Sequence, residues 1–234
     1  MNKLIENAQK LVFKLMESDK SGHGSDHILR VYNLAIKFAE AEGADKTIVS
    51  LAALLHDVDD YKIVGKENSE KMINTKMILN ELNVDNNKQN YIIDIIKSMG
   101  YSNYLKGIRP KTLEGQIVSD ADMCDAIGSS GIVRSIVYAT SSKGNGIIFD
   151  RDVYPNVNIT NEEYNQKGTT HSTDNAINHF FEKLLKLNNL MMTKSGKKES
   201  NKRQKIMIDF LRQYFYEENA KEWLEFLDEF LKSN

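Results

Sequence analysis

The residues best suited to chemistry are a neighbouring histidine and aspartate, His56 and Asp57, which follow the most apolar stretch of the chain. Ala52 and Ala53, one helical turn earlier, are small and leave space around the imidazole ring. A buried histidine beside a buried aspartate is costly unless both are paired or bound to a metal ion. Two interpretations of this pair stay open: part of a metal site, or a histidine hydrogen-bonded at a helix C-terminus, where the helix dipole favours a cation.

A second histidine and a group of acids favour the metal interpretation. His27 lies four residues before Val31 and therefore projects from the apolar face of its predicted helix, where an imidazole needs a partner. Three acids, Asp120, Asp122 and Asp125, interrupt an apolar segment. Asp122 and Asp125 share a helix face, with Asp120 elsewhere on the helix surface. Acids in a buried helix usually serve a cation or a hydrogen-bond network.

Together these residues resemble the H…HD…D signature of the HD-domain superfamily of metal-dependent phosphohydrolases, and in particular its small bacterial single-domain subgroup. The likeness extends from about residue 21 to about residue 215 and is carried by four segments: 23–31 (HGSDHILRV), 54–60 (LLHDVDD), 117–122 (IVSDAD) and 178–187 (NHFFEKLLKL). The resemblance implies that one divalent ion is ligated by His27, His56, Asp57 and Asp122.

The residue types in this ligand set restrict the choice of metal. Two imidazoles and two carboxylates suit a six-coordinate ion, for which we favour Mn²⁺, with Mg²⁺, Fe²⁺, Co²⁺ and Ni²⁺ as alternatives. A structural zinc site would more often use cysteine, and the chain has one, Cys124. Relatives with two or three metals carry further histidines between the HD pair and the last aspartate, and none lies between Asp57 and Asp122. We therefore expect one ion, and hydrolysis rather than oxygen chemistry.

Metal-assisted hydrolysis also needs a base that accepts a proton from water. We expect Asp60 to be this base, because it lies four residues after His56, about one turn if the helix continues that far. Asp60 also matches the acidic position that the family often keeps just after the HD pair. Asp59 is the second candidate.

A phosphorylated substrate needs cationic groups to hold its charge. The side chains assigned to this role, mainly through the resemblance, are His23, Arg30, Lys97, His179, Lys183 and Lys186. His179, Lys183 and Lys186 follow one another at spacings of four and three, which would line one helix face. Two alternatives stay open: His23 can equally be a capping or surface residue, and each lysine alone can be a solvated surface residue.

The resemblance implies hydrolysis of phosphate esters or phosphoanhydrides, and some close relatives split nucleoside triphosphates to monophosphate and pyrophosphate. We therefore expect a nucleotide pyrophosphohydrolase of this kind. One alternative is a nucleotidase or phosphodiesterase that uses the same metal site. Another is a metal-dependent nucleotide sensor without turnover, which the retained Asp60 disfavours. The expected partner is a small phosphorylated molecule, with a nucleotide as first choice.

The elements that position these residues are predicted to be helices. The chain has two prolines, both outside the periodic segments, and almost no alternating β-branched stretches. We predict one all-α bundle of the HD-domain type over residues 1–234, with its core at about 21–140, a lid-like loop at 143–170 and C-terminal helices at 173–232. A basic segment, 195–205, is predicted as a short polar break and solvated helix end. The first predicted helix is 25–41, with Ser25 or Asp26 as its N-cap and Gly43 as its C-cap. The other predicted helices are one opening at Thr47, 69–82, 88–99, 113–127, 131–140, 173–192, 198–216 and 220–231.

Composition supports this class of protein. The 234 residues include 31 basic and 33 acidic side chains, for a formal charge of −2, which argues against general nucleic-acid binding. One cysteine excludes an internal disulfide framework and fits a reducing cytosol. No apolar run is long enough for a membrane span, so we expect a cytoplasmic protein. No pattern predicts the oligomeric state.

Overall fold

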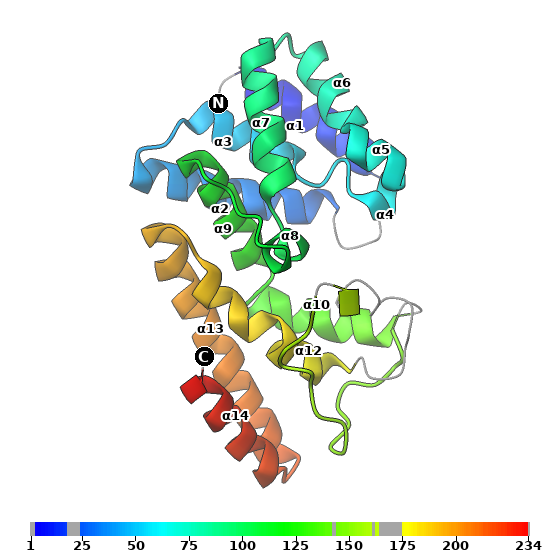
Figure 1. Ribbon diagram of the computed structural model, residues 1–234, viewed down its shortest axis with the longest axis vertical. Coiled ribbons are helices and arrows are strands. Elements are labelled where there is room, and N and C mark those ends of the chain that lie inside the picture. Colours follow the sequence, from blue (N-terminus) through cyan, green and yellow to red (C-terminus); the bar gives the residue numbers. More distant parts are fainter. Residues whose placement is uncertain (1–2, 18–23, 142–143, 161, 164–174, 234) are drawn as a thin grey trace. The chain divides into compact units, whose positions relative to one another are not determined.

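The computed structural model describes residues 3–17, 24–141, 144–160, 162–163 and 175–233. Within these ranges every regular element is helical, which confirms the predicted all-α class (Figure 1). The chain divides into two compact units, Met1–Asp122 and Met123–Asn234, and each has buried apolar side chains. The expectation of a single domain over 1–234 stays a prediction. No helix in the described ranges is both long enough and apolar enough to cross a membrane.

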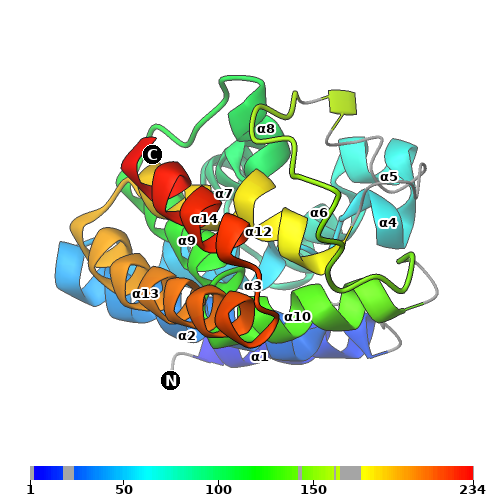
Figure 2. The same cartoon turned by 90° about the horizontal axis from the view of Figure 1, so that it is seen from below.

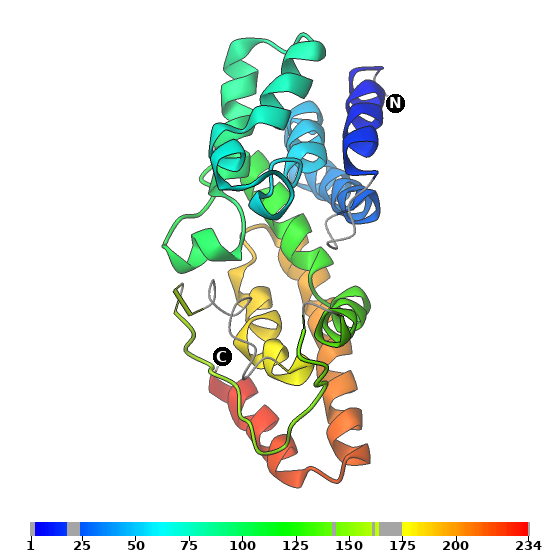
Figure 3. The ribbon, with the colours of Figure 1, turned by 90° about the vertical axis from the view of Figure 1, so that its right-hand side faces the viewer.

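The first unit is arranged around α3, which contacts α1, α2 and α7 (Figure 3). Every residue of α3 from Ile48 to Leu55 is buried, as its apolar sequence predicts. The helices of this unit are α1 (Lys3–Met16), α2 (Ser25–Glu42), α3 (Lys46–Leu55), α4 (Tyr61–Val64), α5 (Lys66–Lys71), α6 (Ile73–Glu81), α7 (Asn86–Ser98), α8 (Tyr101–Leu105) and α9 (Leu113–Asp125), the last of which extends past the unit boundary.

Helix α3 begins and ends close to where its sequence pattern places it. The Asp45 carboxylate accepts hydrogen bonds from the backbone N–H groups of Thr47, at 2.8 Å, and Ile48, at 3.1 Å. Asp45 is therefore the N-cap, one of the residue types preferred there. At the other end the last helical residue is Leu55, and His56 is the C-cap. The His56–Asp57 pair thus directly follows a buried helix.

Helix α2 also matches its predicted span, but not its predicted N-cap. Gly43 takes the left-handed conformation, φ 76°, and its N–H donates to the Ala39 carbonyl at 2.9 Å, as expected of a C-cap glycine. The predicted N-cap, Ser25 or Asp26, is wrong: both residues lie inside the helix. Gly24 occupies the N-cap position without a side-chain hydrogen bond.

The helix predicted over 69–82 is interrupted. Met72 has φ 54° and ends α5, and α6 begins at the next residue. A left-handed methionine is uncommon because its Cβ crowds the following carbonyl oxygen. Burial of the Met72 side chain, which is 5% exposed, holds the residue in this conformation.

The second unit contains a helical hairpin formed by α13 and α14 (Figure 2). Aromatic side chains fill its core, with Phe181 and Phe215 arranged around Trp223, which is fully buried. The helices of this unit are α10 (Ser129–Thr140), α12 (Ala176–Glu182), the 3₁₀ helix η1 (Leu184–Leu190), α13 (Lys194–Glu217) and α14 (Lys221–Ser233).

Two expectations for the second unit are wrong. Residues 195–205 form no break, because Thr193 caps α13 by accepting from the Gly196 N–H at 2.9 Å and the helix continues through the basic segment. The described part of the helix predicted over 173–192 is α12 followed by the 3₁₀ helix η1. Buried leucines in η1 recur every third residue (Leu184, Leu187, Leu190), the period of a 3₁₀ helix.

Candidate metal centre

Four side chains that are distant in sequence meet in the first unit. Nε2 of His27 lies 3.1 Å from Nε2 of His56, 3.3 Å from Oδ2 of Asp57 and 3.5 Å from Oδ1 of Asp122. Nε2 of His56 lies 3.4 Å from the same Asp57 oxygen and 3.8 Å from the same Asp122 oxygen. We call these four residues the donor cluster.

Three helices and one turn position the donor cluster. His27 lies in the first turn of α2, His56 follows α3, Asp57 lies in the turn over 56–59, and Asp122 lies in the last turn of α9. The two imidazoles are almost fully buried, with side chains 6% and 4% exposed, whereas the side chains of Asp57 and Asp122 are 14% and 28% exposed. The carboxylates are therefore the more solvent-accessible part of the cluster.

The orientation of His56 is fixed by the backbone. Its Nδ1 lies 2.8 Å from the carbonyl oxygen of Ala53. Because a carbonyl can only accept, Nδ1 carries the proton and Nε2 presents a lone pair to the cluster. Metal-binding histidines commonly use such a second hydrogen bond to set their tautomer and ring angle.

The donor set fits a divalent cation. A lone pair on Nε2 of His56 and the oxygens of two carboxylates face one another within this cluster. A shared cation would be held by all four side chains, and imidazole with carboxylate suits Mn²⁺ and similar ions. His27, His56 and Asp57 also form the candidate metal-binding group found among the described residues.

The two candidate bases differ in their surroundings. Helix α3 ends before His56, so Asp60 does not lie one helical turn after it as expected, but on the far side of a turn. Asp60 is half-exposed and its backbone N–H donates to the Asp57 carbonyl at 3.1 Å. Asp59 is buried, and each of its carboxylate oxygens accepts a backbone N–H of α6. This difference favours Asp60 over Asp59 as the base.

The expected substrate-binding residues of the first unit are exposed where they are described. Arg30 lies on α2, three residues after His27, and its side chain is exposed. Lys97 lies in the last turn of α7 and is also exposed. His23 lies outside the described residues.

The remaining expected residues belong to the second unit. His179 and Lys183 are half-buried, and α12 ends just before Lys183, so the predicted common helix face is interrupted. Lys186 donates to the carbonyl oxygen of Val157, and burial lowers the pKa of its ammonium. The substrate-binding role of these three residues stays a prediction.

Part of the predicted loop over 143–170 is fixed to the C-terminal hairpin. Tyr154 stacks on Trp223, with ring centroids 4.7 Å apart. Arg151 forms an ion pair with Glu222 at 2.9 Å and donates to the Glu218 carbonyl at 2.7 Å. Residues 150–154 therefore lie against α14 rather than forming an unattached flap.

The acids near the donor cluster have separate roles. Asp125, three residues after Asp122, is 2% exposed and lies 3.5 Å from Nη1 of Arg134. Asp120, expected elsewhere on the helix surface, is fully buried. Of the three acids, Asp122 is therefore the one that joins the donor cluster.

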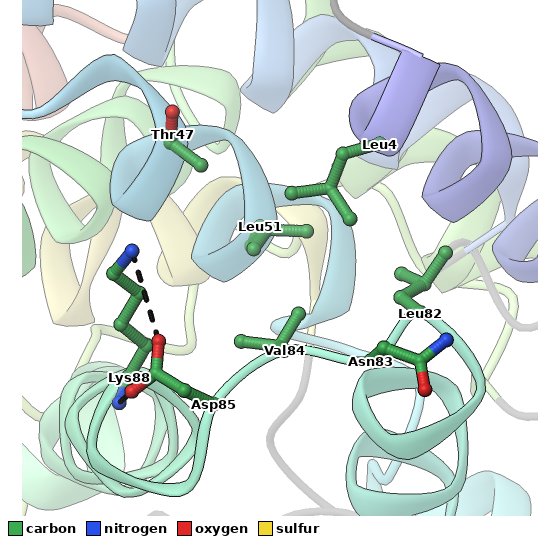
Figure 4. A pocket seen from close by; sticks show the side chains of 8 residues that line it. All are labelled: Leu4, Thr47, Leu51, Leu82, Asn83, Val84, Asp85 and Lys88. Atoms are coloured by element: carbon green, nitrogen blue, oxygen red, sulfur yellow. Dashed lines mark hydrogen bonds and ion pairs between the residues drawn. The ribbon is translucent and has the colours of Figure 1, made fainter.

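A pocket of about 150 Å³ lies near the beginning of α3 (Figure 4). The donor cluster lies at the other end of the same helix, and none of the expected site residues lines the pocket. Both apolar and polar side chains line the pocket, and two of the polar ones, Lys88 and Asp85, form an ion pair at 3.7 Å. Its lining residues are Leu4, Thr47, Leu51, Leu82, Asn83, Val84, Asp85 and Lys88.

Comparison with known proteins identifies the family. Residues 24–127 match the HD domain family. The chain is 30% identical over 213 residues to the uncharacterized protein YpgQ of Bacillus subtilis, covering 90% of this chain and 92% of the relative. The chain belongs to the HD-domain family. Its small size and helical fold agree with the bacterial relatives in this comparison.

Solved structures of relatives share the fold over almost the whole chain. A Lactobacillus plantarum protein superimposes with a TM-score of 0.78 at 35% identity, covering 94% of this chain and 98% of its own. An HD-superfamily hydrolase of Bacillus thuringiensis superimposes with a TM-score of 0.69 at 33% identity, covering 92% of this chain and 97% of its own. The structure of YpgQ in complex with ADP superimposes with a TM-score of 0.67 at 26% identity, covering 92% of this chain and 95% of its own. A hydrolase is the class that these neighbours support.

Several supporting residues were not found from sequence. The Ala53 carbonyl and the amides of Asn74 and Thr75 act through their backbone atoms, which residue type does not reveal. The buried state of Asp59 follows from the position of α6 and has no local signal. Asp45 carried a recognisable signal, because an aspartate directly before an apolar helix is a typical N-cap.

Proposed function

We propose that this protein is a divalent-metal-dependent phosphohydrolase that cleaves nucleoside triphosphates to monophosphate and pyrophosphate. The donor cluster carries the proposal, because two imidazoles and two carboxylates converge within 3.8 Å of one another in the pairs described above. The complex of the relative YpgQ with ADP supports a nucleotide as the substrate. Mn²⁺ is the ion that we propose, at one site per chain.

In the proposed reaction, the oxygen of water forms a bond to the α-phosphorus. The bond from that phosphorus to the bridging oxygen breaks, and pyrophosphate leaves with the electron pair. The donor cluster would hold a divalent ion, and that ion would supply Lewis-acid polarisation of a phosphoryl oxygen and a lowered pKa of water. Asp60 accepts the proton released by the attacking water, since it is the half-exposed carboxylate that follows the ligand pair.

The chain's cationic groups bind and orient the substrate in this proposal. Arg30 is one helical turn from His27, and its guanidinium can hold a phosphate with two parallel hydrogen bonds. Lys97, His23, His179, Lys183 and Lys186 are the further proposed phosphate contacts. The half-buried Asp57 and Asp122 leave one side of the cluster open for the substrate.

The test is product analysis with purified protein and Mn²⁺. Nucleoside triphosphates, nucleoside monophosphates and cyclic nucleotides are offered separately, and products are resolved by chromatography. Pyrophosphate and monophosphate from triphosphates support the proposal. Inorganic phosphate from monophosphates, or opening of cyclic nucleotides, would instead show a nucleotidase or phosphodiesterase.

Two variants separate binding from turnover. Asp60→Asn should retain Mn²⁺ and nucleotide but lose about 10²- to 10⁴-fold in kcat, the usual contribution of a general base. Asp94→Asn is the matched control, because Asp94 is an exposed acid on α7, outside the proposed site. Tight nucleotide binding without turnover in the wild type, unchanged by Asp60→Asn, would identify a sensor.

A further inference from the structure

Asp59, two residues after the ligand Asp57, lies against the beginning of α6. It is 5% exposed, and both of its carboxylate oxygens are used: Oδ1 accepts from the Asn74 N–H at 2.9 Å and Oδ2 from the Thr75 N–H at 2.8 Å. Amides in the first turn of a helix have no partner within the helix. Asp59 therefore caps α6 from 15 residues earlier in the chain.

Helix α6 lacks a cap of its own. Met72 occupies the N-cap position and makes no side-chain hydrogen bond to the helix. A serine, threonine, asparagine or aspartate would normally supply that bond. The Asp59 carboxylate supplies it instead, and its negative charge also favours a helix N-terminus.

A second hydrogen bond strengthens the connection. The Asn74 side-chain Nδ2 donates to the Val58 carbonyl at 2.8 Å. Both residues that follow the His56–Asp57 pair are thus bonded to the first turn of α6. Residues 56–59 form a turn beyond the end of α3. Its last two residues, Val58 and Asp59, are the ones that α6 holds.

We propose that Asp59 is a positioning residue for the metal centre. By capping α6 it fixes the turn that carries two of the four ligands, and it thereby sets the affinity for the ion. The proposal rests on the metal-dependent function proposed above and deepens it. It also gives Asp59 a role other than that of the base.

The expected effect is graded across three variants. Asp59→Ala removes both hydrogen bonds and should weaken Mn²⁺ binding by about 10- to 100-fold, the range typical for loss of a group that orients a metal ligand. Asp59→Asn retains a carbonyl oxygen that can accept one N–H, so its Mn²⁺ affinity should fall less than that of Asp59→Ala. Asn74→Ala removes only the bond to the Val58 carbonyl, so its Mn²⁺ affinity should also fall less.

The experiment is calorimetric titration of the metal-free full chain with Mn²⁺, alongside thermal unfolding. Asp85→Ala is the matched control. The Asp85 carboxylate caps α7 by accepting from the Lys88 N–H at 3.1 Å, and it does not touch the turn over 56–59. Its loss destabilises a helix of the same unit, so comparison with Asp59→Ala separates positioning from stability. If Asp59→Ala does not fold, Asp59→Asn and Asn74→Ala provide the measurement.

Weaker Mn²⁺ binding in the Asp59 and Asn74 variants, with wild-type binding in Asp85→Ala, supports the proposal. Equal affinity in the wild type and the Asp59 variants overturns it and leaves the proposed function intact. Full Mn²⁺ affinity with lost turnover in Asp59→Asn also overturns it, and would identify Asp59 as the base. A wild-type chain that binds no Mn²⁺ contradicts the proposed function as well.

Discussion

Nε2 of His27 lies 3.1 Å from Nε2 of His56, although 29 residues separate them in the chain. The rings meet edge to face, with centroids 5.1 Å apart. The Ala53 carbonyl accepts from the opposite nitrogen of His56, so that Nε2 of His56 faces His27 as a lone pair. This contact brings His27 to the HD pair, so both histidines would hold the proposed ion.

The first prediction concerns metal stoichiometry and His27. We expect the wild type to bind one Mn²⁺ per chain and to gain about 2.7 kcal/mol of stability when free Mn²⁺ is a hundred times its Kd. His27→Ala should bind no Mn²⁺ in this range and should show no such gain. Calorimetric titration and thermal unfolding with and without Mn²⁺ measure both effects.

A matched histidine variant serves as control for this prediction. His179→Ala removes a half-buried histidine of the second unit and should retain one equivalent of Mn²⁺. Loss of the ion in His179→Ala, or its retention in His27→Ala, would show that the donor cluster is not the metal site.

The second prediction distinguishes two acids of α9. Asp122→Asn should abolish Mn²⁺ binding, because an amide replaces a ligating carboxylate. Asp125→Asn should retain Mn²⁺ but lower the free energy of unfolding by about 1–3 kcal/mol, because Asp125 is buried beside Arg134 and its carboxylate is bonded within the fold. Metal titration and urea unfolding of both variants test whether Asp122 serves metal binding and Asp125 serves stability. The assignment fails if the two variants exchange phenotypes.

The sequence predicts the long helices because their apolar residues repeat at helical spacing. Helix α2 and its C-cap Gly43 match the prediction, and α3 matches to within one residue at its start. The break at Met72 could not be predicted, because a left-handed methionine has no local signal and depends on burial of its side chain and on a cap from Asp59. The change to a 3₁₀ helix did have a signal, in leucines that repeat every third residue from Leu184.

The candidate site could be predicted as a set of residues but not as a geometry. His27, His56 and Asp57 follow from an imidazole on an apolar face and from the resemblance, and the structure places them together with Asp122. The sequence ranks Asp60 before Asp59 as the base only by its spacing from His56 and by the resemblance, and it does not indicate what surrounds either carboxylate. What separates them is α6, which buries Asp59 and uses both of its oxygens.

The third prediction is a pH dependence of stability from Glu114. Its carboxylate accepts from the Tyr91 hydroxyl at 2.7 Å and from the Asp45 N–H at 3.2 Å. Burial would raise the pKa of Glu114, but these hydrogen bonds outweigh it and the pKa is lowered from its ordinary 4.5. A carboxyl with a lowered folded-state pKa stabilises the fold above the unfolded-state pKa, and this contribution is lost as the pH falls through the folded-state pKa.

Glu114→Gln should therefore lower the free energy of unfolding by about 1 kcal/mol at pH 7. The effect is small because hydrogen bonds stabilise a partly exposed carboxylate only modestly. The difference from wild type should shrink as the pH falls below 4.5, the ordinary pKa of the group. Urea unfolding across this pH range measures it. Glu40→Gln is the control: Glu40 is an exposed partner of Lys46, and its loss should have almost no effect. A Glu114 effect that is constant with pH would contradict the assignment.

The fourth prediction concerns the anchor of residues 150–154 on α14. Trp223 is the only tryptophan of the chain and is fully buried, so the tryptophan fluorescence reports on the surroundings of this one ring. Tyr154 stacks on its ring, and the indole N–H donates to the Arg151 carbonyl at 3.1 Å. Tyr154→Ala should shift the tryptophan emission to the red. It should also lower the free energy of unfolding by about 1–2 kcal/mol, because buried area and ring stacking are lost.

Tyr138→Ala is the control for this anchor, because Tyr138 is 51% exposed and Tyr154 is 50% exposed. Its loss should leave the emission unchanged and the free energy of unfolding within about 0.5 kcal/mol of wild type. Equal effects of the two variants would show that exposure, and not stacking on Trp223, decides the outcome.

The same emission tests the predicted lid in the wild type: a red shift on adding nucleotide and Mn²⁺ would mean that Tyr154 leaves Trp223 during binding. Unchanged emission would mean that residues 150–154 stay fixed on α14, and any closing movement would have to come from another part of the 143–170 segment.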